Sequence, residues 1–344
     1  MLYKFRVVLT GLIGLLYSFA FVSAPFAQEF YKGKTITFVL GSSPGGGFDA
    51  YTRTIARHFA KHVPGNPSVV VDYMPGAGGL IAANQLYNNK SMREGLTIGL
   101  WAGSFVLSQR LGEKGIQFDA KSFDWVGVPV RDSPICVLTK ASGINSIQDW
   151  FAAKRQIKLG GLGPGSTPSV PARVLKAALG LPIQLIDGYK GTSEIRLAAE
   201  GGEVDGGCWN WESIKVMWRA GLESGDAKIV LQVNPQRHPE LPNVPNAIEM
   251  AKTENAKLLI KIGVHDQTSI FRAYSIPPHV PQDRVKLLQK AFADTMKDPD
   301  FLADANRSKL DIYPLSGEQV KQIVDGMLTL DSKVVADLKK ILLE

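Results

Sequence analysis

Metal-binding and nucleophilic side chains are scarce in this sequence. Only two cysteines and five histidines occur among its 344 residues. None of the histidines has the spacing of a zinc ligand set or stands as an evident base beside a nucleophile. Ser166, which follows Gly165, lacks the Gly-x-Ser-x-Gly pattern of a nucleophile elbow. We therefore expect no bound metal, no cofactor and no catalytic residues.

A basic block is also absent. The formal net charge is +7, but the lysines and arginines are scattered and form no ladder with aromatic residues. This distribution argues against a nucleic-acid partner. Hydrophobic residues make up 45% of the chain and the mean hydropathy is close to zero, which is typical of a chain that folds around an ordinary core.

Long apolar runs are missing everywhere except at the start of the chain. Residues 1–6 carry two basic side chains, an apolar stretch runs from Val7 to Val22, and small residues lead to Ala27. This pattern is typical of a secretory signal peptide, for which we place the cleavage after Ala27. The alternative is an uncleaved anchor, because the stretch is only slightly shorter than a spanning helix. The remaining chain is expected to be exported and soluble.

The two cysteines, Cys136 and Cys208, would lie in an oxidising compartment if the chain is exported. One disulfide between them is then allowed. Two free, buried thiols are equally consistent with the sequence.

Short runs of β-branched residues alternate with amphipathic segments, which predicts an α/β fold with largely parallel sheets. About 315 residues follow the signal peptide, which is long for one core and favours two lobes. We expect helices at Ala50–His62, Leu80–Tyr87, Gln282–Met296 and Gly317–Leu330. The expected strands are Thr35–Leu40, Val69–Asp72, Leu96–Leu100, Ile135–Thr139, Lys158–Gly161, Ile183–Ile186, Val204–Asp205, Ile229–Val233 and Arg272–Ile276.

The domain boundaries follow from the order of these elements. The Pro-rich stretch His238–Pro245 is expected to be a connector rather than a helix or strand. The proposed organisation is a signal peptide, the first part of lobe 1, lobe 2, and a connector that returns to lobe 1, at residues 1–27, 28–129, 130–237 and 238–344.

Two glycine-rich loops follow neighbouring predicted strands, and each precedes a helix. Glycine lets a bound group approach the backbone amides, and the helix dipole favours an anion there. Neither loop has the spacing of a P-loop or a dinucleotide site, so a carboxylate fits better than a phosphate. We expect the amides of residues 45–47 and 77–79 to face one cavity. The loops are Pro44-Gly45-Gly46-Gly47 and Pro75-Gly76-Ala77-Gly78-Gly79.

Other polar side chains are candidates for the same site. Asp49 is expected to brace the first loop. Trp209 and Asn210 would follow a strand and could cover the ligand, although a tryptophan there is also compatible with ordinary core packing. Four hydroxyl residues precede predicted helices and either donate to the ligand or cap their helices: Ser104, Ser166, Thr167 and Thr192.

Taken together, these motifs resemble the Bug family, the extracytoplasmic solute receptors of tripartite tricarboxylate transporters. The resemblance covers nearly the whole chain after the signal peptide. It implies a type II periplasmic-binding-protein fold, with two lobes joined by crossing strands and a ligand carboxylate held by main-chain amides. The matching segments are residues 36–39, 44–49, 74–79, 163–167, 188–192 and 201–206.

The chain departs from the family pattern where the ligand would be selected. Pro168-Ser169-Val170-Pro171 stands where members often carry a histidine, and Gly207–Trp211 is more aromatic than usual. We therefore count Ser169 among the candidate ligand residues. The resemblance implies a monomeric periplasmic receptor that delivers a small organic carboxylate to a membrane permease. A sensory receptor of the same fold and, less favoured, a secreted hydrolase are the alternatives.

Overall fold

The computed structural model of the chain describes residues 30–163 and 165–343. The expected signal peptide, residues 1–27, lies outside the described residues. No helix in the described part is both long and apolar enough to span a membrane.

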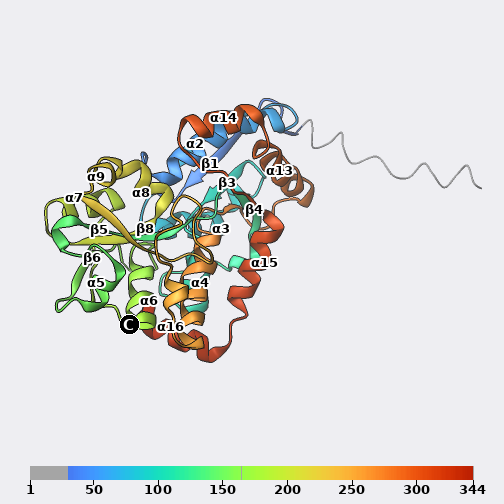
Figure 1. Cartoon of the computed structure of the whole chain (residues 1–344). Coiled ribbons are helices and arrows are strands. Elements are labelled where there is room, and N and C mark those ends of the chain that lie inside the picture. Colours follow the sequence, from blue (N-terminus) through green and yellow to red (C-terminus); the bar gives the residue numbers. More distant parts are fainter. Residues whose placement is uncertain (1–29, 164, 344) are drawn as a thin grey trace, which may run out of the picture.

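The chain folds into two α/β lobes, each built on its own sheet (Figure 1). The six-stranded sheet of lobe 1 has the order β11-β4-β10-β3-β1-β2, and the five-stranded sheet of lobe 2 has the order β7-β6-β8-β5-β9. Lobe 1 contains β1 (Thr35–Leu40), β2 (Ser68–Tyr73), β3 (Thr97–Leu100), β4 (Asp124–Val128), β10 (Tyr274–Ile276) and β11 (Leu315–Ser316). Lobe 2 contains β5 (Pro134–Thr139), β6 (Ile157–Gly160), β7 (Ile183–Ile186), β8 (Gly206–Asn210) and β9 (Ala227–Gln232).

Helices surround both sheets. The expected two-lobed α/β architecture is confirmed, but the expectation of largely parallel sheets is wrong, because both sheets are mixed: β10 and β11 pair antiparallel in lobe 1, and β5 pairs antiparallel with β8 and β9 in lobe 2. Lobe 1 carries α2 (Gly47–Phe59), α3 (Leu80–Asn88), α4 (Phe105–Leu111), α13 (Gln282–Thr295), α14 (Pro299–Arg307) and α15 (Gly317–Leu328). Lobe 2 carries α5 (Ile147–Ala152), α6 (Ser169–Leu179), α7 (Thr192–Glu200), α8 (Trp211–Met217) and α9 (Arg219–Ser224).

The chain crosses between the lobes twice. Residues 129–133 form the short first crossing, between β4 and β5, and residues 233–273 form the second, between β9 and β10. The second crossing contains α10 (Ala247–Met250), α11 (Glu254–Ile260), a π-helix (Lys261–Asp266) and α12 (Gln267–Ser269). Two crossings leave the facing edges of the sheets free to form a cleft.

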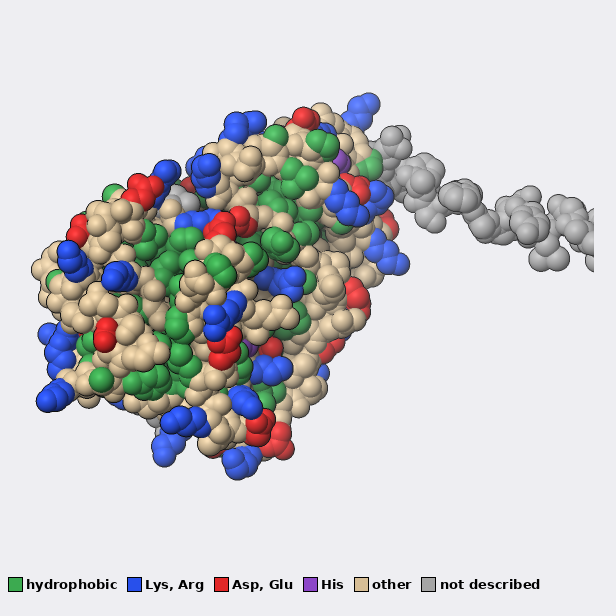
Figure 2. Space-filling view, in the orientation of Figure 1, with side chains coloured by type: hydrophobic (Ala, Val, Ile, Leu, Met, Phe, Trp, Pro, Cys, Tyr) green, Lys and Arg blue, Asp and Glu red, His purple; other side chains and the backbone are tan. Residues whose placement is uncertain are grey.

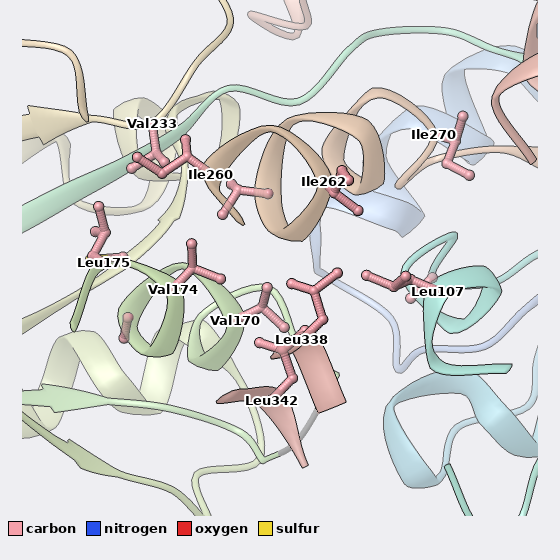
Figure 3. Packing of buried hydrophobic residues seen from close by; sticks show 14 of the residues in the cluster. Leu107, Val170, Val174, Leu175, Val233, Ile260, Ile262, Ile270, Leu338 and Leu342 are labelled. Atoms are coloured by element: carbon pink, nitrogen blue, oxygen red, sulfur yellow. The ribbon is translucent and has the colours of Figure 1, made fainter. Parts of the chain in front are cut away.

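The C-terminal helix α16 (Ser332–Leu342) contacts both lobes. Figure 3 shows Leu338 and Leu342 beside Val170 and Val174 of α6, while Leu107 of α4 approaches from the other side. One continuous apolar cluster therefore links the lobes along this side of the molecule.

The position of each strand in its sheet explains the strand's pattern of buried and exposed residues. β1 lies between β2 and β3, and four of its residues are buried in the pattern eBiBBB, so an almost uninterrupted apolar run suits it. β2 lies at the sheet edge, and its residues alternate between exposed and partly buried. The strand expected at Val204–Asp205 is wrong by several residues, because β8 spans Gly206–Asn210. A Cβ on Gly206 would collide with the Val137 carbonyl of the neighbouring strand β5. Glycine is therefore needed here for β8 to pair with β5, and not for a turn.

Cys136 and Cys208 form a disulfide. They lie directly opposite each other on the antiparallel strands β5 and β8. The bond therefore cross-links two central strands of the lobe 2 sheet, and it decides between the two alternatives left open by the sequence.

Replacing both cysteines by serine should lower the free energy of unfolding by about 2–4 kcal/mol, because the bond closes a long loop in the unfolded chain. The two residues are 72 positions apart in the sequence. Denaturant titration of the mature protein, with and without reductant, measures the loss. Two thiols that react freely in the native, unreduced protein would show the bond to be absent.

Candidate functional site

The two glycine loops meet at one edge of the lobe 1 sheet. β1 pairs in parallel with β2 and β3, and Leu40 is level with the last residues of both neighbours. A Cβ built on Gly41 would lie only 2.8 Å from the Cα of Gly79. The backbones of the first and second loops are therefore in contact, as expected from strand ends that share an edge.

Amides at this junction are available to a ligand. The Gly45 amide donates to Asp49 Oδ2 at 2.7 Å, and the Gly79 amide donates to the Gly76 carbonyl at 2.9 Å. The other four amides of the two expected trios have no acceptor among residues 30–163 and 165–343: Gly46, Gly47, Ala77 and Gly78. They come from both loops, and Gly46 is the N-cap of the 13-residue helix α2.

Asp49 braces the first loop. Besides the Gly45 amide, its carboxylate accepts Arg53 Nε at 2.7 Å and the Tyr73 hydroxyl at 2.5 Å. Burial alone would raise the pKa of Asp49, but the hydrogen bonds from Tyr73, Gly45 and Arg53 outweigh burial and lower it. Its oxygens are thus occupied by the protein, in agreement with a bracing role. Pro44 lies exposed at the tip of the same loop.

Arg272 lies beneath the start of α2 and was not expected from the sequence. Its side chain is 2% exposed, with the guanidinium carbon 5.6 Å and 4.9 Å from the ring centres of Phe48 and Tyr51. Nε donates to Asp132 Oδ1 at 2.9 Å, and Nη2 lies 2.8 Å from the same oxygen, so the pair joins the second crossing to the first. A Cβ on Gly47 would lie 2.8 Å from Nη1, a nitrogen without an acceptor among the described residues.

Asp132 is the buried partner in this pair. Burial raises the pKa of Asp132 to about 7, although the adjacent Arg272 guanidinium opposes the rise. A lone arginine before a short strand carries no sequence signal for this pairing, since 140 positions separate the two residues.

A small cavity lies between Ser104 of lobe 1 and Thr167, which belongs to the loop after β6 of lobe 2. Ser104 at the start of α4 is 3% exposed, and its hydroxyl has no hydrogen-bond partner in the described part of the chain. Ser104 and Thr167 line a cavity of about 10 Å³ together with Gln267 and Phe271, which is room for one water molecule. The cavity thus lies where lobe 1, lobe 2 and the second crossing meet.

Other hydroxyl candidates have structural partners. Ser166 donates to the Gly163 carbonyl at 2.7 Å. Ser169 accepts the amides of Leu162 and Gly163 and donates to Asp187. Both serines therefore shape the loop.

Thr192 is the first residue of α7, not its cap as expected, because Gly191 holds the N-cap position. Its hydroxyl lies 3.8 Å from Met217 Sδ. The sequence suggested Thr192 because threonine favours caps, but glycine also occupies this position readily.

Trp209 and Asn210 belong to β8 rather than following it, so their expected position is wrong. Trp209 is 2% exposed and stacks on Trp218 with ring centres 5.8 Å apart. This places its ring in the core of lobe 2. Asn210 ends β8 next to the crossings, and its buried Oδ1 has no hydrogen-bond partner among the residues that the structure describes.

Gly76 sets the shape of the second glycine loop. Its φ is +136°, and a Cβ at this position would collide with the Ile81 side chain.

Groups of three or more metal-binding side chains do not occur among residues 30–163 and 165–343. His58 and His62 pair with Asp304 and Asp298 on α14, within lobe 1. Figure 2 shows acidic and basic side chains interspersed over the visible face rather than gathered by sign.

Comparison with known proteins identifies relatives. The family model described as tripartite tricarboxylate transporter family receptor matches residues 52–339. Protein BugT of Bordetella pertussis is 25% identical over 253 residues, which cover 72% of this chain and 74% of BugT. A protein from the TAR-I ttuE-ttuC' intergenic region of Agrobacterium vitis is 24% identical over 283 residues, 79% of this chain and 74% of that protein.

Solved structures share the fold at low identity. MatC from Rhodopseudomonas palustris, with bound malate, has a TM-score of 0.68 and 18% identity, with 89% of this chain and 99% of MatC covered. Rpa4515 from R. palustris, with adipate, has a TM-score of 0.70 and 21% identity, with 90% and 98% covered. The periplasmic binding protein BugD has a TM-score of 0.68 at 20% identity, with 90% and 98% covered.

Substitutions of Gly46 and Gly47 should differ in their effect on stability. Gly47→Ala should cost about 1–3 kcal/mol, because the new Cβ displaces a guanidinium that Asp132 holds in place. Gly46→Ala should cost less, at most about 1 kcal/mol, since nothing in the described chain lies within 4 Å of its Cβ position and only the preference of the N-cap for glycine over alanine is lost. Denaturant unfolding measures both, and equal losses would show that Arg272 does not confine Gly47.

Proposed function

Because the chain belongs to the tripartite tricarboxylate transporter receptor family, we propose that it binds a small organic carboxylate in the periplasm, as a single chain, and delivers it to a membrane permease. The family match covers most of the chain, and the two-lobed fold is shared with solute-binding proteins. The relatives that contain malate and adipate support a carboxylated ligand.

One observation carries the proposal: four amides from two converging loops, two of them at the start of α2, lack acceptors among residues 30–163 and 165–343. A carboxylate has two oxygens that can accept several amides at once. Hydrogen bonds to a charged group each contribute about 1.5–3 kcal/mol, and the helix dipole adds to them. The amide set therefore suits a carboxylate group without requiring a charged side chain at the same place.

We assign the ligand cleft to the space between these loops and lobe 2. The amides of lobe 1 would hold the carboxylate, while Ser104, Thr167 and Asn210 would contact the rest of the solute. Ser104 and Thr167 already face one cavity from opposite lobes. Ligand contacts with both lobes are needed, because a solute shifts the open–closed balance only if it binds the two states differently.

A thermal-shift screen of residues 28–344 against mono- and dicarboxylates, including malate and adipate, tests the ligand class. At least one acid should raise the melting temperature by several degrees, since saturation at about 100 Kd adds roughly 2.7 kcal/mol to stability. The corresponding carboxamides serve as uncharged controls. A shift that the amides reproduce fully would argue against recognition of a carboxylate.

Gly46→Val should lower the affinity for the strongest acid about tenfold or more, with only the small loss of melting temperature that a less favoured N-cap residue causes. The side chain would project into space that the protein leaves open, so it would obstruct only the ligand. Gly326→Val on α15, whose Cβ position is equally open, is the matched control in the same lobe. Unchanged affinity of Gly46→Val by calorimetry would place the carboxylate elsewhere.

A further inference from the structure

Helix α8 of lobe 2 contacts the first crossing and two parts of lobe 1. Glu212 Oε2 accepts the amide of Ser133 in the first crossing at 3.1 Å. Ser213 Oγ lies 3.2 Å from the Cβ position of Gly47 at the start of α2. Lys215, further along the helix, reaches Asp311 of lobe 1. One short helix of lobe 2 therefore contacts a crossing, the first glycine loop and the opposite lobe.

The contact with the opposite lobe is an ion pair. Lys215 Nζ lies 2.5 Å from Asp311 Oδ2, and the two side chains are 17% and 33% exposed. Among the residues that the structure describes, no other ion pair joins a helix of lobe 2 to lobe 1. Asp311 is itself tied to the ligand-binding side of lobe 1, because its carbonyl accepts the hydroxyl of Tyr51 from α2 at 3.0 Å.

Lys215 is held in position by residues on the lobe 2 side, one of them in the second crossing. Its Nζ lies 3.2 Å from Glu240 Oε2, and Glu240 also accepts the indole N–H of Trp211 at 2.5 Å. The Trp211 ring centre is 6.0 Å from Nζ. Burial alone would lower the pKa of Lys215, but the hydrogen bonds to Asp311 and Glu240 raise it. Lys215 is thus charged at neutral pH.

The contacts of Lys215 predict which interactions break when the lobes move apart. Trp211 belongs to α8 itself, and Glu240 lies in the part of the second crossing that packs on lobe 2, where the adjacent Leu241 joins the apolar core of that lobe, so an opening motion leaves both in place. Asp311 belongs to the other lobe, so opening breaks only that half of the network. Because the lysine is already ordered by Glu240, little further side-chain entropy is lost when the pair with Asp311 forms.

We propose that Lys215 and Asp311 form a latch that stabilises the closed lobes and thereby sets the rate at which the bound solute is released. The part concerning solute release rests on the proposed function. The latch acts without touching the solute, since Lys215 is held by Glu240 and Trp211 and meets lobe 1 at Asp311. It also gives Trp211 a role as the residue that positions Glu240.

The latch is tested first without any ligand, by the distance between spin labels on the two lobes. Labels at Ile81→Cys on α3 and Leu197→Cys on α7 occupy exposed positions, and both native cysteines are in the disulfide. Lys215→Met and Asp311→Asn should each shift the distance distribution toward the open form. The double variant should open no further than either single variant, because the two residues act as one pair.

Two comparisons complete the ligand-free experiment. Arg219→Met removes an ion pair confined to α9 and should leave the distances unchanged. Salt at about 1 M should shift the parent protein toward the variants, because it screens a partly exposed pair. Unchanged distances in Lys215→Met and Asp311→Asn, or equal changes in Arg219→Met, would overturn the latch.

Release is measured with adipate as the probe. Both latch variants should release it about 2- to 10-fold faster than the parent, with association rates within about twofold. Equal release rates in parent and variants would overturn the role in release. The two claims can fail separately. If the latch variants open in the spin-label experiment but neither adipate nor any other carboxylate binds the parent protein, the proposed function is refuted and the latch is not.

Discussion

The backbone contact between Gly41 and Gly79 is the constraint on which the site depends. A Cβ on either residue would lie within about 3 Å of the other loop's backbone, closer than Cβ atoms approach neighbouring atoms in proteins. Glycine at both positions lets the loops after β1 and β2 turn toward each other. The amides without acceptors among the described residues then lie at the same edge of the sheet as the positive end of α2, which is the arrangement that the proposed carboxylate site requires.

The second constraint is the buried pair of Arg272 and Asp132, which fastens the two crossings together. A buried ion pair adds little net stability, but removal of one partner typically costs about 3–5 kcal/mol because the other charge is left unpaired. The pair therefore fixes how the crossings lie against each other. Since Phe48 and Tyr51 enclose the same guanidinium, the base of the cleft and the first turn of α2 are positioned together.

Local sequence patterns were sufficient for most strands, though not for β4, β8 and β11, and for the loop geometry on the lobe 1 side. β1, β2 and the two glycine loops could be predicted because each pattern is contained within about ten residues. The pairing of Arg272 with Asp132, the disulfide and the contact of α8 with Asp311 could not be predicted, because each joins residues that are far apart in the chain. Trp209 shows the same limit: its stacking on Trp218 depends on how α8 returns over the sheet, which no local pattern records.

The central claim is that amides from both glycine loops hold one carboxylate. A crystal structure of the mature protein with the acid that stabilises it most tests this claim directly. The account predicts carboxylate oxygens within about 3 Å of an amide from Gly46 or Gly47 and of an amide from Ala77 or Gly78. A carboxylate bound to one loop alone, or to side chains away from both loops, would contradict it.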